Sequence, residues 1–78
     1  MKNNLFLEIC NGNILLLKNI SKIDISSKII EKFIKQMECN IDNYNSSMSS
    51  CSDMYVLFYI SKRIKDINEC ILYLQKIR

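Results

Sequence analysis

The residue types that most often carry out catalysis are sparse or poorly spaced in this chain. It contains no histidine, and its eight acidic residues are scattered singly along the sequence. General acid–base catalysis usually needs a histidine or two carboxylates held close together. Serine and cysteine are plentiful, but such a nucleophile needs a neighbouring base or a lowered pKa. A cysteine activated by a nearby lysine is the one arrangement left open, and we otherwise expect a protein that is not an enzyme.

The four cysteines do not have the spacing of a metal site. Structural zinc sites typically pair their ligands about two to four residues apart. Here 28, 11 and 18 residues separate consecutive cysteines, which are Cys10, Cys39, Cys51 and Cys70. Glu8 interrupts the first apolar run, and the polar residues after Cys10 end it, so no export signal is visible. We therefore expect a cytoplasmic protein with reduced thiols and no metal or other cofactor.

Basic residues of the central segment fall on one strip, where they could follow a phosphate backbone. The strip consists of Lys28, Lys32 and Lys35. The alternative is an ordinary solvated helix face, because Glu31 and Glu38 lie among the lysines. The net charge is only +3, and no helix-turn-helix or zinc-finger spacing is present. The sequence favours the solvated face and leaves a small nucleic-acid-binding regulator as the second hypothesis.

The last segment carries aromatic and basic side chains outside its apolar stripe. Tyrosine and arginine are enriched at protein interfaces because each combines a large contact area with a polar tip. The same residue types can stack on unpaired bases, or the rings could cover the N-terminal segment as ordinary core. We interpret the set as a candidate protein interface, with these two alternatives open. Its members are Tyr55, Phe58, Tyr59, Lys62, Arg63 and Tyr73.

Two amphipathic helices are expected to position these side chains. Apolar residues from Ile30 to Tyr44 recur at helical spacing, which predicts a helix over 26–43. A second and longest helix is predicted over 53–77, and a Ser- and Asn-rich loop over 44–52 would make the pair antiparallel. The stripe of the second helix alternates spacings of three and four, as in coiled coils. It consists of Leu57, Ile60, Ile64, Ile67, Ile71 and Leu74.

The N-terminal segment, residues 4–20, is predicted to form a β-hairpin. Two apolar runs flank Asn11-Gly12, and this dipeptide suits a type I′ turn because both residues tolerate positive φ angles. A lone hairpin is marginally stable, so it should pack on the helices. The predicted fold of residues 1–78 is a single α+β domain in the order strand–strand–helix–helix.

The apolar content predicts association. Apolar residues make up 49% of 78 residues, more than two helices and a hairpin readily hide. The stripe of the last helix also extends beyond the shorter apolar stretch from Ile30 to Tyr44, so part of it would lack a helical partner within the chain. We therefore expect a homodimer through the C-terminal helix. The longest apolar run, Met54–Ile60, is far shorter than the roughly 20 residues of a membrane span, so no membrane association is expected.

The amino-acid usage favours a particular kind of source. Isoleucine, asparagine and lysine are abundant, while alanine, threonine and proline are absent, which is typical of an AT-rich genome. Together with the small size and the lack of catalytic residues, this favours a phage, virus or mobile-element protein. We expect a stoichiometric inhibitor or adaptor of anti-defence, anti-CRISPR-like or toxin-neutralising type. An obligate subunit of a larger assembly is the third hypothesis.

Overall fold

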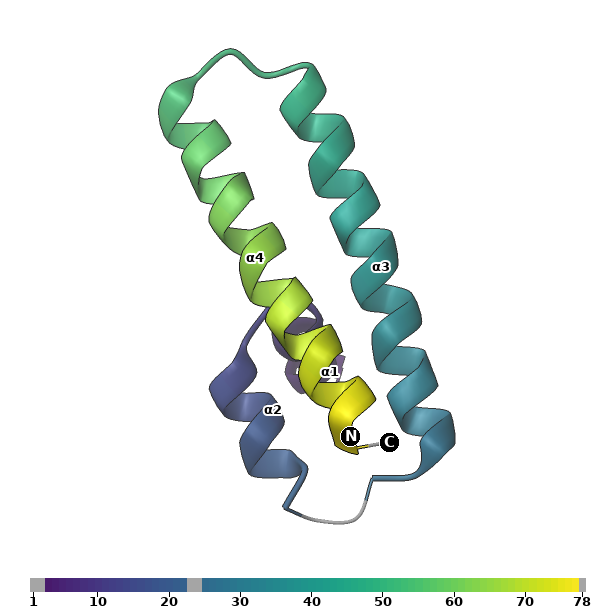
Figure 1. Cartoon of the computed structure of the whole chain (residues 1–78). Coiled ribbons are helices and arrows are strands. Elements are labelled where there is room, and N and C mark those ends of the chain that lie inside the picture. Colours follow the sequence, from purple (N-terminus) through teal and green to yellow (C-terminus); the bar gives the residue numbers. More distant parts are fainter. Residues whose placement is uncertain (1–2, 23–24, 78) are drawn as a thin grey trace.

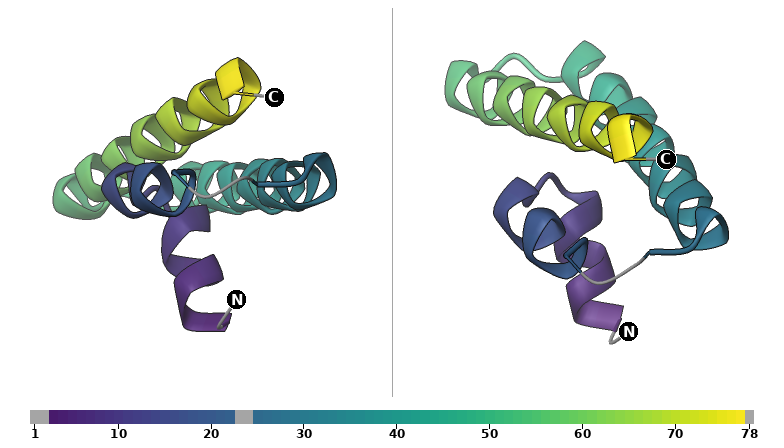
Figure 2. Two further views of the ribbon diagram at one scale, coloured as in Figure 1. Left: turned by 90° about the horizontal axis from the view of Figure 1, so that it is seen from below. Right: turned by 60° about the horizontal axis from the view of Figure 1, so that its bottom comes forward.

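Four helices form the regular structure of residues 3–22 and 25–77, which the computed structural model describes. In chain order they are α1 (Asn3–Cys10), α2 (Ile14–Ile20), α3 (Ser27–Ser49) and α4 (Met54–Ile77). The two long helices, α3 and α4, run antiparallel. The short helices α1 and α2 lie together on one side of that pair, away from the α3–α4 connection (Figure 1, Figure 2). The molecule is therefore elongated, with principal extents of 42 × 23 × 19 Å.

The predicted β-hairpin over residues 4–20, and with it the α+β class, is wrong. This stretch forms two helices, and no strand occurs in the described ranges. The apolar run that suggested a strand also has helical spacing, because Ile9 and Cys10 follow Leu5 and Phe6 by four residues. A short run of this kind fits either structure. Packing decides for the helix, since Ile9 and Cys10 become fully buried when α1 contacts α3.

The Asn11-Gly12 dipeptide ends α1 instead of turning a hairpin. Gly12 has a φ of +104°, and its amide donates to the carbonyl of Ile9 at 3.0 Å. The amide of Asn13 donates to the carbonyl of Glu8 at 3.3 Å. These two hydrogen bonds define the Schellman C-cap, which favours glycine for the same reason as a type I′ turn. Asn13 then caps the start of α2 through its side chain.

The segment predicted as a loop over 44–52 is mostly helical, because α3 continues to Ser49. Tyr44 and Met48 extend its apolar spacing and are half-buried. The hydroxyl of Ser49 donates to the carbonyl of Ser46 at 2.8 Å, so this polar side chain is satisfied within the helix. Serine and asparagine lower helix stability by only about half a kcal/mol each relative to alanine. Packing against α4 outweighs that cost.

The two long helices are consequently matched in length, with 23 residues in α3 and 24 in α4. One reason for expecting a homodimer was that part of the last helix would lack a helical partner within the chain. That reason is wrong, because α3 reaches almost to the start of α4. Self-association would have to use surfaces that stay exposed.

The hydrophobic core lies where α1 and α2 meet the long pair. Phe6 of α1 stacks on Phe33 of α3, with ring centroids 5.1 Å apart. On α4, the predicted stripe faces inward, since Ile60, Ile67 and Leu74 are buried. The core cluster consists of Ile9, Cys10, Leu17, Ile30, Phe33, Met37, Ile67, Cys70 and Leu74. Within the described part of the chain, no helix has both the length and the hydropathy needed to cross a bilayer.

Candidate functional site

The first turns of α4 expose large apolar side chains. Tyr55 is 89% exposed, Met54 81%, Phe58 77% and Tyr59 53%. The short helices cover the opposite end of the α3–α4 pair, so they do not reach this end (Figure 1). The neighbouring end of α3 is rich in serine and asparagine and offers little apolar surface. Tyr55 and Phe58 are therefore not part of the core, and that alternative interpretation is wrong for them.

The exposed surface continues along α4 as a stripe that we call the outer face. Its members alternate spacings of three and four, and every one of them is exposed. Leu72, near the other end of the helix, is 65% exposed. Only the first three members were singled out from the sequence, although continuing the spacing from Tyr55 would have found the rest. The outer face consists of Tyr55, Phe58, Lys62, Lys65, Glu69, Leu72 and Lys76.

Arg63 lies beside the outer face and joins α4 to the end of α1. Its Nε donates to the Tyr59 hydroxyl at 3.3 Å, and the guanidinium stands 5.3 Å from the Tyr59 ring centroid. Its Nη1 donates to the backbone carbonyl of Asn11 at 3.4 Å. That carbonyl belongs to the C-terminal end of α1, where a positive charge is favourable. The hydrogen bond with Tyr59 raises the pKa of Arg63, so the guanidinium stays charged.

A polar hollow of about 260 Å³ opens next to Arg63, where α1, the α1–α2 turn, α3 and α4 converge. The hydroxyl of Tyr44 donates to Asn11 Oδ1 at 3.4 Å across one side of it. Glu8 and Arg63 bring opposite charges to the lining, so the hollow has no single sign of charge. Its lining residues are Glu8, Asn11, Asn13, Tyr44, Tyr59 and Arg63. They provide hydrogen bonds and charges for binding, without a nucleophile beside a base.

Tyr73 takes a different role from the other aromatic residues predicted at the interface. It is half-buried, packs against the core, and shares a hydrogen bond between its hydroxyl and that of Ser21. The Nζ of Lys18 lies 5.8 Å from the centroid of its ring. Tyr73 therefore attaches α2 to α4 and does not belong to the outer face.

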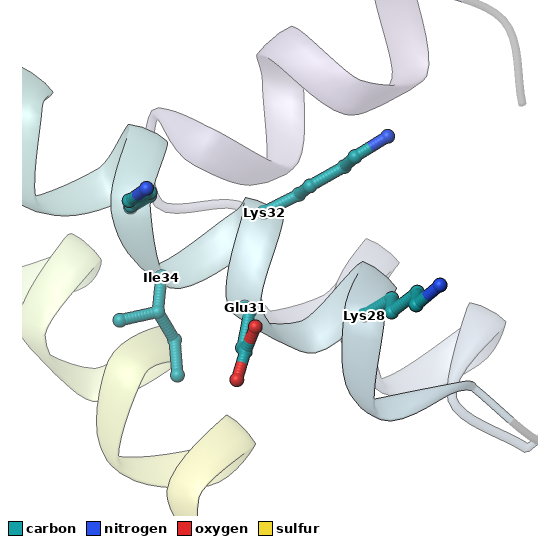
Figure 3. A pocket seen from close by; sticks show the side chains of 5 residues that line it. Lys28, Glu31, Lys32 and Ile34 are labelled. Atoms are coloured by element: carbon teal, nitrogen blue, oxygen red, sulfur yellow. The ribbon is translucent and has the colours of Figure 1, made fainter.

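The strip of Lys28, Lys32 and Lys35 lies on α3, apart from the outer face of α4. These lysines line a shallow hollow of about 380 Å³ together with Glu31 and Ile34. Lys28 and Lys32 point to one side of the helix, whereas Glu31 and Ile34 point to the other (Figure 3). All the residues named in its lining come from one helix. All three lysines are exposed, so the strip lies on a solvent-facing side of α3.

The cysteines fall into two classes. Cys10 and Cys70 are fully buried, while Cys39 is exposed and Cys51 half-buried, and all four are free thiols. Burial, followed by the proximity of Cys70, raises the pKa of the Cys10 thiol to about 12. Burial, followed by the charges of Asp66 and Glu69, raises the pKa of the Cys70 thiol to about 11. Both buried thiols are thus protonated and unreactive at neutral pH.

Searches of protein-family models, of curated proteins and of solved structures find no match to this chain. Across residues 3–22 and 25–77, histidine, cysteine and acidic side chains form no group of three suited to a metal ion. The remaining guide to function is the surface that the fold presents. The most distinctive part of that surface is the outer face of α4 with Met54 and Tyr59 at its edge.

Proposed function

We propose that this chain is a small, non-catalytic protein-binding module that acts stoichiometrically through the outer face of α4. The observation that carries the proposal is the exposure of Tyr55 and Phe58 on a regular helix anchored by a buried core. Removing a ring of this size from water contributes roughly 1.5–3 kcal/mol. A folded monomer seldom leaves several such rings side by side in water unless they meet a partner.

The surroundings of the two rings suit a protein partner. Protein interfaces combine an aromatic centre with a polar, charged rim. Met54 and Tyr59 adjoin Tyr55 and Phe58, and Lys62 follows one turn along the helix. Because the rings are fixed on α4, binding costs little ordering of the backbone.

Nucleic-acid binding is the second candidate, and the charge pattern favours it less. Proteins that follow phosphates present an unbroken run of cations. On α4, Asp66 and Glu69 come between Lys65 and Lys76. On α3, Glu31 and Glu38 lie among the lysines of the strip. The two groups of lysines also lie on different helices, so they do not form one track.

The amino-acid usage, which is typical of an AT-rich genome, and the small size of the chain support a phage, virus or mobile-element origin. A phage, virus or mobile element of an AT-rich host carries compact genes, and a short chain without catalytic residues acts by occupying a surface. We therefore propose an inhibitor or adaptor of a host enzyme or defence complex, located in the cytoplasm.

The proposal is tested by placing a photo-crosslinking amino acid at position 58 and exposing the protein to extract of its native host. Leu15 on α2 is the matched control position, because it is apolar and 73% exposed but lies outside the outer face. We expect a protein adduct at position 58 that is absent at position 15 and that excess unlabelled wild-type chain suppresses. The adduct should persist at high salt, since apolar contacts depend little on ionic strength.

Two outcomes would contradict protein binding. The first is equal labelling at positions 58 and 15, which would mean that the outer face is not a specific surface. The second is an adduct with nucleic acid that disappears steeply as salt rises, as counterion release requires.

A further inference from the structure

A hollow of about 540 Å³ lies between the two long helices. We call it the back hollow, and it is lined by Glu38, Ile41, Asp42, Asn68 and Ile71. The first three residues come from α3 and the other two from α4, and none of them belongs to the outer face. The back hollow is therefore a second surface of the α3–α4 pair.

The back hollow lies on the side of α3 that faces away from α1. The side chain of Asn40 reaches α1, because its Nδ2 donates to the Cys10 carbonyl at 3.0 Å. Glu38 and Asp42 are each two residues from Asn40, and two residues turn a helix by about 200°. Both acidic side chains therefore leave α3 on the side away from the short helices, which cover only the other side of the long pair (Figure 2).

An apolar floor and an acidic wall meet in the back hollow. Ile41 and Ile71 are half-buried, since they pack against the core and still border the hollow. Glu38 and Asp42 are exposed on the α3 side, and Asn68 is exposed on the α4 side. No basic side chain is among the described lining residues. The hollow therefore offers apolar contact and negative charge together.

The charge of the back hollow determines which class of partner fits it. Glu38 and Asp42 repel the phosphates of nucleic acid and the headgroups of anionic lipids. They attract a protein segment that carries lysine or arginine. Apolar side chains of such a segment are stabilised when they leave water and contact Ile41 and Ile71. The complementary partner is a protein segment that is both basic and apolar.

The spacing of the two carboxylates favours a helical segment. Glu38 and Asp42 are four residues apart on α3, which places them about 6 Å apart along the helix axis. A helix lying along α3 presents its own side chains with the same repeat, so cations at positions i and i+4 meet both carboxylates. Its apolar side chains then enter between α3 and α4, as in other complexes that hold a helix in a groove.

We propose that the back hollow binds a basic amphipathic helix of a protein partner, laid along the α3–α4 pair as a third long helix. Lysine or arginine side chains of that helix pair with Glu38 and Asp42, while its apolar stripe covers Ile41 and Ile71. This site goes beyond the proposed function, because it leaves the outer face free for another protein. A chain with both surfaces connects two proteins, which favours an adaptor over a simple inhibitor.

The test uses a fluorescent peptide of about 20 residues, about 30 Å long as a helix, with leucine on one face and lysine on the other. The control peptide has glutamate at every lysine position. Fluorescence anisotropy with the whole chain should give a Kd at least about tenfold lower for the lysine peptide. Glu38→Lys combined with Asp42→Lys should raise that Kd at least about tenfold.

A matched double variant controls for net charge. Glu8→Lys combined with Glu69→Lys makes the same total change, but both residues are exposed and lie outside the back hollow. The Kd of the lysine peptide should then stay within about threefold of wild type. Circular dichroism would verify that each variant keeps its helix content. A photo-crosslinking amino acid at position 68 should form an adduct with the lysine peptide, whereas one at the exposed control Leu15 should not.

Equal binding of the two peptides, equal weakening by the two double variants, or no adduct at position 68 would overturn the proposal. Sedimentation velocity of the chain alone tests another occupant. If the chain self-associates and Glu38→Lys with Asp42→Lys abolishes this, a second copy fills the back hollow and the proposal is wrong. The outer face is tested separately by the host adduct at position 58, so failure of one surface is distinguishable from failure of the other.

Discussion

The backbone of Gly12 lies directly against Asp66 of α4. A Cβ added at Gly12 would stand 2.7 Å from the Cβ of Asp66 and 3.1 Å from the amide nitrogen of Ile67. The only glycine of the chain thus does two things at once, because its positive φ ends α1 and its missing side chain lets the turn approach α4. The turn between α1 and α2 is a packing element of the core.

Gly12→Ala should destabilise the fold by at least about 2 kcal/mol. Part of the loss comes from a positive φ angle that alanine adopts poorly. The rest comes from the overlap with α4, because the atoms in the way belong to its backbone and to a Cβ and cannot move aside. Urea denaturation followed by circular dichroism would measure it. Ser52→Ala, an exposed change in the α3–α4 connection, is the control and should be nearly silent. Equal stability of the two variants would contradict the close approach.

Arg63→Ala should reduce the free energy of unfolding by about 1 kcal/mol, the usual contribution of a hydrogen bond. It removes the cap on the Asn11 carbonyl and the contact with Tyr59. Lys32→Ala removes an exposed basic side chain from α3 and should change stability by less than about 0.5 kcal/mol. Thermal melts of the two variants would compare them. A silent Arg63→Ala would mean that this side chain does not secure α1 to α4.

Ile67→Asp should abolish folding. Ile67 is fully buried in the core, and burying an unpaired carboxylate costs several kcal/mol in a domain whose total stability is about 5–15 kcal/mol. Leu72→Asp is the matched control on the same helix, because Leu72 is 65% exposed. We expect a helical, cooperatively melting protein for Leu72→Asp and loss of the transition for Ile67→Asp. Similar melts would contradict the inward orientation of Ile67.

The cysteines should react with Ellman's reagent in two groups. Cys39 and Cys51 should react in the folded protein at neutral pH, since each has access to solvent. Cys10 and Cys70 should react only at the rate of unfolding, because they are buried and protonated. Denaturant should therefore expose two further thiols. Prompt labelling of four thiols in the native state would show that the core is open.

The raised thiol pKa values also predict a loss of stability in alkaline solution. Folding raises the pKa of Cys10 from 9.0 to about 12 and that of Cys70 from 9.0 to about 11, so the folded state holds these protons more tightly. The stabilisation that comes from these raised pKa values is fully present below pH 9.0. It declines as the pH rises toward the pKa values of the folded state. Urea midpoints at neutral pH and at about pH 10 would measure the decline. Replacing both residues by alanine should make it smaller, and an unchanged decline would assign it to other groups.

The two long helices are predictable from the sequence because their apolar residues recur over many turns. The spacing of Ile60, Ile67 and Leu74 places all three on one face of a single helix. That face is buried against the core, as expected. The same spacing shows that Tyr55 and Phe58 project away from that stripe, whereas their exposure is decided by the tertiary structure. The start of α4 lies within one residue of the predicted position, with the side chain of Asp53 accepting from the amide of Tyr55 at 2.9 Å.

The N-terminal helix pair and the end of α3 could not be predicted in the same way. Two short apolar runs around Asn11-Gly12 satisfy a hairpin and a helix pair equally well, because the positive φ of glycine serves both turns. Asn40 Nδ2 donates to the Cys10 carbonyl at 3.0 Å, which satisfies the end of α1 from a residue thirty positions away. A hydrogen bond between residues so far apart cannot be predicted from the local sequence pattern. The Ser- and Asn-rich stretch before Ser50 likewise becomes helical, with Tyr44 packed against the core.

The sequence alone therefore determined the inward stripe of α4, the absence of histidine and of paired cysteines, and the candidate face around Tyr55 and Phe58. The tertiary structure decided the class of the fold, the length of α3 and the role of each aromatic residue. Tyr73 and Tyr55 both lie off the main stripe of α4. Tyr73 shares a hydrogen bond with Ser21 at the end of α2, whereas Tyr55 is exposed to solvent. Local spacing fixes where a side chain points on its own helix. Only the packing of distant segments decides what, if anything, covers it.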